Sequence, residues 1–141
     1  MAASRMACFT SGSTGVPKGV VACHRSVIDY IENLSETLGF NENTVFANQA
    51  PLYFDACLKE IIPTIKYGAS TCIIPKQLFM FPIKLVEFLN EKKINTVCWV
   101  VSALTMISST GTLEKNPPRY LRTVAFGSEV FPTAQYRLWR E

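Results

Sequence analysis

From Phe9 to Val20 the chain reads FTSGSTGVPKGV, and this stretch contains three glycines, four hydroxyl side chains and one lysine. Hydroxyl groups and the backbone N–H groups of a glycine-rich loop can approach and bind anionic oxygens. Lys18 adds a positive charge that suits a terminal phosphate. A loop of this composition can also be an ordinary surface turn, so the order of its residues has to decide between the two interpretations.

The segments on either side of this loop favour strands. Residues 6–9 predict a short buried strand, and residues 19–23 predict a second strand. A helix is expected to begin at Ser26, with Asp29 as a weak capping partner and Gly39 as its end. The apolar stripe of this helix consists of Val27, Tyr30, Ile31, Leu34 and Leu38.

Strand-like and helical segments alternate along the rest of the chain. Strands are predicted at 44–47, 70–75, 95–101 and 122–126. Helices are predicted at 54–67, 82–93, 102–109 and from 132 onward, and a loop at 111–118. In the helix at 54–67, Leu58, Ile61, Ile62 and Ile65 lie on one side, Pro63 is expected to introduce a kink, and Gly68 is expected to end the helix. The alternation predicts a layered α/β fold with a mostly parallel sheet flanked by helices, in one domain that spans residues 1–141.

Ligands of such sheets bind beyond the carboxyl ends of the strands. The candidate loops are therefore 10–19, 48–55, 100–103 and 127–131, each of which follows a predicted strand. His24 is the only histidine. It could act as a general base, but we favour a polar residue before a helix, because no Ser or Cys partner can be placed beside it.

Composition excludes several classes of function. The net charge is +3 and the longest basic run is Lys92-Lys93, which does not indicate a nucleic-acid interface. No apolar run approaches the ~20 residues of a membrane span, and the N-terminus lacks a secretory signal. The five cysteines are odd in number and form no C-x-x-C pair, so free thiols in a reducing cytoplasm are expected.

The loop at residues 9–20 is not a Walker A motif, because Gly19 follows Lys18 where Ser or Thr is required, and this argues against a generic P-loop NTPase. It resembles the phosphate loop of the adenylate-forming superfamily, and ten positions between Thr10 and Val20 match that signature. The resemblance implies binding of ATP with Mg²⁺ and a catalytic role for Lys18. The residues that it assigns to the ATP phosphates are Thr10, Ser11, Gly12, Ser13, Thr14, Gly15 and Lys18.

A second match covers residues 48–56, which read NQAPLYFDA. In amino-acid-activating members of the superfamily, an aspartate at the position of Asp55 holds the α-amino group of the substrate. The lead-in at 48–51 looks most like the D-alanine–carrier-protein ligases, and nonribosomal peptide synthetase adenylation domains are also similar. The alternative is that Asp55 only caps its helix.

A third match is weaker. Residues 124–132 resemble the Gly-Gly-Glu-Ala-Leu-Pro turn that lines the adenine and acyl pocket, which makes Phe126, Gly127 and Ser128 candidate substrate-binding residues. Ser128 replaces the second glycine, so the contact with the base is in question. Glu129 is expected to have a structural role in the turn. Trp99 and its neighbours at 100–101 are expected to border the substrate pocket, although a tryptophan is more often only part of the core.

The resemblance spans nearly the whole chain but only about a quarter of a complete adenylating enzyme. The family's magnesium-binding glutamate, ribose-binding motif and C-terminal lysine are absent from these residues, so no metal ligand is predicted and we expect a fragment that does not catalyse by itself. The high apolar content of 48% indicates either many strands buried on both faces or a face that meets a missing part. Self-association or a marginally stable monomer is therefore expected.

The function that these matches imply is activation of an amino acid as aminoacyl-AMP, followed by transfer to the phosphopantetheine thiol of a carrier protein. An acyl- or aryl-CoA ligase is an alternative, against which Asp55 argues. A non-catalytic remnant that binds only the nucleotide is the other alternative. We expect a cytoplasmic protein without nucleic-acid or membrane partners.

Overall fold

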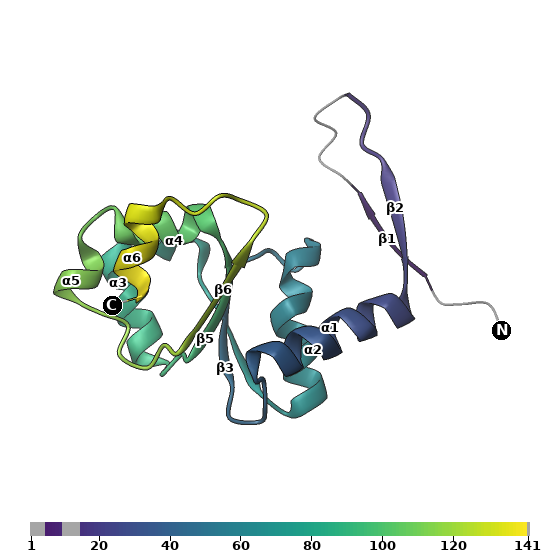
Figure 1. Cartoon of the computed structure of the whole chain (residues 1–141), viewed down its shortest axis with the longest axis horizontal. Coiled ribbons are helices and arrows are strands. Elements are labelled where there is room, and N and C mark those ends of the chain that lie inside the picture. Colours follow the sequence, from purple (N-terminus) through teal and green to yellow (C-terminus); the bar gives the residue numbers. More distant parts are fainter. Residues whose placement is uncertain (1–4, 10–14, 141) are drawn as a thin grey trace.

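The computed structural model describes residues 5–9, by their backbone, and residues 15–140. Its centre is a parallel sheet with the strand order β4-β3-β5-β6 (Figure 1). These strands are β3 (Val45–Asn48), β4 (Ser70–Ile73), β5 (Thr96–Val100) and β6 (Thr123–Gly127). The predicted layered α/β fold with a mostly parallel sheet is thereby confirmed.

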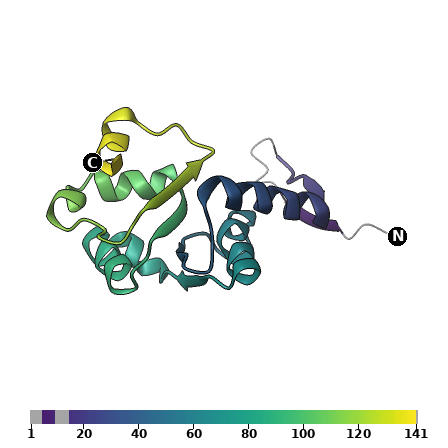
Figure 2. The same cartoon turned by 60° about the horizontal axis from the view of Figure 1, so that its bottom comes forward.

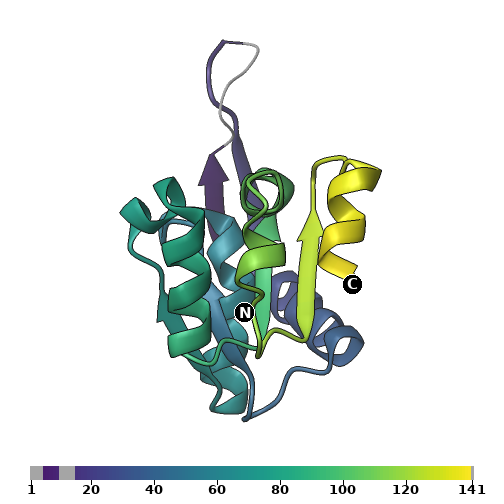
Figure 3. The same cartoon turned by 90° about the vertical axis from the view of Figure 1, so that its left-hand side faces the viewer.

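Helices cover both faces of this sheet (Figures 1 and 3). One face carries α1 (His24–Leu38) and α2 (Leu58–Tyr67). The other carries α3 (Pro82–Glu91), α4 (Val101–Ser108), α5 (Thr112–Lys115) and α6 (Thr133–Arg140). Two 3₁₀ turns, at Asp55–Cys57 and at Lys76–Met80, precede α2 and α3.

Successive side chains of β5 enter opposite cores, as the period of two in a strand requires. Val97 and Trp99 belong to the larger core, together with side chains such as Leu85 and Leu104. Cys98 belongs to a smaller core, whose other buried members are Phe40 and Phe46. The prediction of a strand buried on both faces at 95–101 is therefore confirmed.

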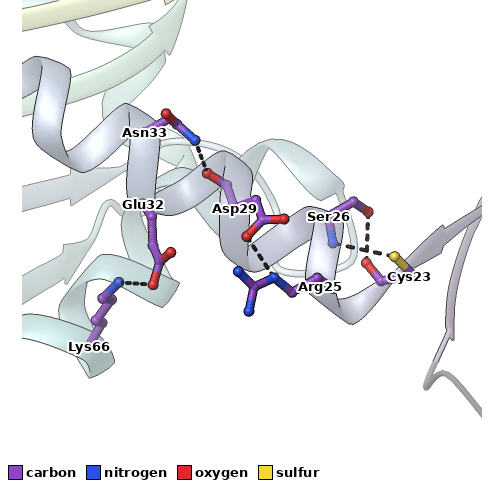
Figure 4. Close-up of polar contacts among 7 residues, drawn as sticks. All are labelled: Cys23, Arg25, Ser26, Asp29, Glu32, Asn33 and Lys66. Atoms are coloured by element: carbon purple, nitrogen blue, oxygen red, sulfur yellow. Dashed lines mark hydrogen bonds and ion pairs between the residues drawn. The ribbon is translucent and has the colours of Figure 1, made fainter. Parts of the chain in front are cut away.

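The first helix begins two residues earlier than predicted. Its N-cap is Cys23, whose Sγ accepts a hydrogen bond from the Ser26 backbone N–H at 3.4 Å (Figure 4). Asp29 does not cap the helix, because its carboxylate pairs with Arg25 at 2.8 Å. The helix ends at Gly39 as predicted, where a φ of 69° favours glycine.

The predicted apolar side of α2 is only partly buried. Leu58, Ile61 and Ile62 are half-buried, whereas Ile65 is 79% exposed. The fully buried positions are Glu60 and Pro63 in α2 and Cys57 just before it, spaced three residues apart, so a charged residue lies on the buried side. Helix α2 continues through Pro63 to Tyr67.

Three other boundaries are corrected. The predicted loop at 111–118 contains the short helix α5. Helix α4 spans Val101–Ser108, one residue earlier than the predicted 102–109. Helix α3 ends at Glu91, and Lys93 takes a positive φ of 51° just beyond it, so Lys92-Lys93 follow the helix instead of forming its last turn.

Strands β1 (Arg5–Phe9) and β2 (Gly19–Cys23) form an antiparallel hairpin that is separate from the main sheet. The hairpin stands off the body beyond the N-terminal end of α1 (Figures 1 and 2). Val20 and Val21 in β2 are exposed, and so is Ala7 in β1. The prediction of a buried strand at 6–9 is therefore wrong for the part of β1 whose burial is described.

Candidate functional site

A cavity of about 770 Å³ opens at the carboxyl ends of β3, β5 and β6. Gln49 follows β3, Trp99 and Val100 end β5, and the turn 127–129 follows β6. Residues from the base of β2, from α1 and from the start of α2 complete the wall. Three of the four candidate loops thus meet at one place, as the parallel sheet predicts.

Asp55 is the first residue of the 3₁₀ turn that precedes α2, and it lines this cavity. Within residues 15–140 its carboxylate has no hydrogen-bond or ion-pair partner, and the cap positions of the turn and of α2 carry no side-chain cap bond. Lys59, one helical turn later, lines the same cavity without an ion pair to Asp55. The geometry therefore gives no support to a role for Asp55 as a helix cap.

The turn after β6 keeps a conformation that favours glycine. Ser128 has a φ of 69°, in the left-handed region that L-residues other than Asn and Asp rarely adopt. Gly127 and Ser128 both line the cavity. Ser128 therefore adopts a conformation that glycine would take without strain, and it adds a hydroxyl group to the turn.

Glu129 has a structural role, as predicted. Its Oε2 accepts a hydrogen bond from the backbone N–H of Ser102 at 2.7 Å, at the start of α4. A carboxylate in this position satisfies an N–H group that no helical carbonyl can reach, and it suits the positive end of the helix dipole. Glu129 thereby connects the turn after β6 to the start of α4.

Phe126 does not line the cavity. Its ring packs edge-on against Phe131, with ring centroids 4.9 Å apart, and against Tyr136 at 6.2 Å. Trp99 has two roles, because it is buried in the larger core and also lines the cavity. Its indole N–H donates to the carbonyl of Ala47 at 2.7 Å, which fixes the ring between β3 and β5.

Glu60 is the residue that the sequence analysis missed. It is 1% exposed and accepts hydrogen bonds from Asn48 Nδ2 at 2.8 Å and from the backbone N–H of Cys98 at 3.1 Å. Burial raises the pKa of this carboxyl group to about 7, against the lowering effect of both hydrogen bonds and of the Lys59 charge. The sequence signal for its burial was position: Glu60 lies three residues after Cys57 and three before Pro63, and both of these residues are buried.

Neighbouring groups titrate outside the neutral range. Burial raises the pKa of the Cys98 thiol to about 12, and the charge of Glu60 raises it further. Burial also raises the pKa of the Cys57 thiol and that of the Tyr30 hydroxyl. Cys23, Cys57, Cys72 and Cys98 are all free thiols, as expected from their spacing.

The predicted phosphate loop lies partly outside the described residues. Thr10, Ser11, Gly12, Ser13 and Thr14 belong to this undescribed part. Gly15 has a φ of 122°, and Lys18 precedes β2 on the exposed side of the hairpin. The structure does not bring Lys18 into the cavity that Asp55 lines.

Metal ligands were not predicted for this chain. Over residues 5–9 and 15–140, no three His, Cys, Asp or Glu side chains come together as a group that could hold an ion. Among the same residues, none of the helices is both long enough and apolar enough to span a bilayer.

Sequence comparison finds enzymes that load amino acids onto carrier proteins. An L-proline–[L-prolyl-carrier protein] ligase from Pseudomonas fluorescens is 34% identical over 129 residues, which are 92% of this chain and 26% of that protein. Nonribosomal peptide synthetase 8 from Aspergillus fumigatus is 35% identical over 131 residues, which are 93% of this chain and 2% of that protein. The chain thus spans about a quarter or less of the length of these relatives.

Solved structures share the fold. ATP-bound MatB from Rhodopseudomonas palustris superposes with a TM-score of 0.80 at 22% identity, over 94% of this chain and 26% of that protein. CmiS6 superposes with a TM-score of 0.80 at 29% identity, over 95% of this chain and 31% of that protein. The family model described as AMP-binding enzyme matches residues 4–141. The chain therefore belongs to the AMP-binding enzyme family, and its sequence relatives are amino-acid–carrier-protein ligases and nonribosomal peptide synthetase adenylation domains.

Proposed function

We propose that this chain supplies the phosphate loop and the amino-acid cavity of an ATP-dependent ligase that activates an amino acid as aminoacyl-AMP. One observation carries the proposal: the Asp55 carboxylate lines a cavity beyond the strand ends without a partner among the described residues. A carboxylate in that position can bind a substrate ammonium by charge-assisted hydrogen bonds. The carrier-protein ligases among the sequence relatives support the same assignment.

In the proposed reaction, a carboxylate oxygen of the amino acid attacks the α-phosphorus of ATP. The bond between this phosphorus and its bridging oxygen to the β-phosphate breaks, and pyrophosphate leaves. Thr10–Gly15 and Lys18 would stabilise the negative charge that builds up on the leaving phosphates. Asp55 would hold the ammonium group, while Gly127 and Ser128 border the bound substrate. Phe126 was predicted to contact the substrate, and its place outside the cavity lining gives that role no support.

Two amino acids are the first substrates to test. The stretch Asn48-Gln49-Ala50-Pro51 resembles the D-alanine–carrier-protein ligases, whereas two of the sequence relatives are named as prolyl ligases. Both substrates carry the ammonium group that Asp55 would bind. An acyl- or aryl-CoA ligase, the alternative, needs no carboxylate at this position.

The complete reaction needs groups that these 141 residues do not supply, so we expect the chain alone to bind phosphates weakly without catalysing adenylation. A remnant that binds only the nucleotide is the second candidate function. Exposed apolar side chains on the hairpin and beside β4 favour self-association; they include Val20, Val21, Ile73, Met80 and Phe81. A cytoplasmic location and a carrier-protein partner belong to the same proposal.

The test is binding of D-alanine and L-proline to the 141-residue chain, followed by NMR, with the des-amino acids propionate and cyclopentanecarboxylate as controls. We expect binding of an amino acid that shifts the Asp55 and Trp99 resonances, and weaker binding of its des-amino analogue. Equal binding of both forms would contradict amino-acid recognition. Amino-acid-dependent ATP–pyrophosphate exchange, with the Pseudomonas fluorescens relative as positive control, measures whether the chain also catalyses.

A further inference from the structure

The ladder between β3 and β5 is shorter than its neighbours. It pairs only Phe46 with Thr96, whereas β5 and β6 pair over five positions and β3 and β4 over four. Beyond that single pair, side chains bind the backbone groups of both strands. The N–H of Cys98 donates to Glu60, and the carbonyl of Ala47 accepts from the Trp99 indole.

Glu60 therefore connects three parts of the cavity wall. Through Cys98 it holds the end of β5, where Trp99 and Val100 line the cavity. Through Asn48 it holds the end of β3, next to Gln49. Through its own helix it holds the segment from Asp55 to Lys59.

The carboxylate does not itself line the cavity, and it is 1% exposed. A buried carboxylate is costly unless it is hydrogen-bonded, and Glu60 accepts one bond from Asn48 and one from the Cys98 backbone N–H. Both donors lie next to residues that line the cavity, so the two bonds hold parts of its wall. We propose that Glu60 is the positioning residue of the cavity, which holds the ends of β3, β5 and α2 in the arrangement that binds the substrate; this rests on the proposed function.

The positioning role can be tested by changing the protonation state of Glu60. In the ionised form, one oxygen of Glu60 accepts a hydrogen bond from Asn48 and the other accepts one from the Cys98 N–H. Protonation of either oxygen would place an O–H group opposite a donor, so one of the two hydrogen bonds would be lost. Its carboxyl group titrates at about pH 7. The titratable groups around it are the Cys98 thiol on β5, the Cys57 thiol before α2 and the Lys59 ammonium on α2, while β3 presents only the amide of Asn48.

The experiment compares wild type, Glu60→Gln and Leu89→Ala in the 141-residue chain. Leu89 is buried in the larger core and does not line the cavity, so its replacement lowers stability without touching the wall. NMR follows the Cys98 amide and the Trp99 indole from pH 5.5 to 8.5, and D-alanine and L-proline are the binding probes. The Glu60→Gln chain keeps His24, so any contribution of that histidine to the pH profile is subtracted.

We expect the Cys98 amide and the probe affinity of the wild type to change together near pH 7, with weaker binding on the acid side. In Glu60→Gln the pH dependence should vanish and binding should be about tenfold weaker, the lower end of what loss of an outer-shell partner costs in metal sites. Leu89→Ala should lower the melting temperature and leave probe affinity unchanged. Unchanged affinity in Glu60→Gln, or equal loss in both variants, would overturn the positioning role.

Failure of the proposed function gives a different result. If the wild type binds neither probe, the proposal of amino-acid recognition by this chain is wrong. The positioning role of Glu60 is then tested by the NMR shifts of residues in the cavity wall. Shifts of Gln49, Asp55 and Val100 together in Glu60→Gln, absent from Leu89→Ala, would support positioning. Shifts confined to Asn48 and Cys98 would overturn it. If Glu60→Gln does not fold, the same resonances are followed in the wild type as the pH is varied. Shifts of Gln49, Asp55 and Val100 together near pH 7 would support the positioning role, and shifts confined to Asn48 and Cys98 would overturn it.

Discussion

The hairpin and the central sheet both contain valines in their strands, but these valines have very different surroundings. Val20 is 54% and Val21 is 61% exposed, whereas Val97 in β5 is fully buried. The strand propensity of valine therefore does not by itself distinguish the two regions. The difference shows that the hairpin is held by its own ladder, while the sheet is held by helices on both faces. A two-stranded hairpin is marginally stable by itself.

The largest difference between the two regions is expected from truncation of apolar side chains. Leu104→Ala, in the core, should lower the free energy of unfolding by about 2–5 kcal/mol, because it leaves a cavity. Val21→Ala in the hairpin should change it by no more than about 0.5 kcal/mol. Urea denaturation of both variants measures this. Equal losses would mean that the hairpin packs against the body in solution.

The buried carboxyl of Glu60 makes the stability of the body depend on pH. Its pKa rises from 4.5 to about 7 on folding, so between these values the folded protein retains a proton that the unfolded chain has lost. Stability should therefore fall as pH rises from about 4.5 to about 7, by about 3 kcal/mol from this group, and level off above. Denaturation of wild type and Glu60→Gln across this range measures the difference. Parallel pH profiles would exclude a titrating Glu60.

In the hairpin region, loss of a charge should weaken phosphate binding. Lys18→Ala should weaken ATP or pyrophosphate binding by about 1–3 kcal/mol, the scale of a charge-assisted contact. Lys84→Ala, on the exposed surface of α3, is the matched control for removal of one positive charge. Calorimetric titration compares the three proteins. If the two variants bind alike, the loop does not bind phosphates through Lys18.

At the edge of the body, Asp55→Asn should reduce binding of an amino acid by about 1–2 kcal/mol and leave its des-amino analogue nearly unaffected. Asp29→Asn is the control, because Asp29 pairs with Arg25 on the surface of α1. The quantity measured is the ratio of the two affinities for D-alanine and propionate, or for L-proline and cyclopentanecarboxylate. If Asp55→Asn weakens binding of the amino acid and of its des-amino analogue equally, Asp55 has a structural role instead.

The smallest effect concerns the turn after β6. Ser128→Gly should raise the free energy of unfolding by up to about 1 kcal/mol, because glycine adopts a φ of 69° without strain. Ser109→Gly, at a φ of −71°, should give no such gain. Thermal unfolding of the two variants compares them. A stabilised Ser109→Gly with an unchanged Ser128→Gly would show that the turn is not strained.

Much of the molecule follows from local patterns. The alternation of segments predicts the layered fold, and the apolar run in β5 predicts a strand buried on both faces. Gly39 and Gly68 predict two helix ends correctly, because a left-handed residue there favours glycine. The motif around residues 9–20 places the chain in its family, which the match to the AMP-binding model confirms. These features depend on neighbours in sequence, so they can be recognised without coordinates.

Other features depend on contacts that no local pattern contains. The separation of the hairpin from the sheet depends on which strands find parallel partners. The burial of Glu60 depends on Asn48 and on Cys98, which lie 12 and 38 residues away in the sequence. A carboxylate on a helix surface and one inside a core have the same local sequence, because the difference lies in distant hydrogen-bond donors. The sequence by itself therefore determined most of the helices and strands, the family and the candidate ligand-binding loops. Only the tertiary structure decided which charged side chains line the cavity and which are buried behind its wall.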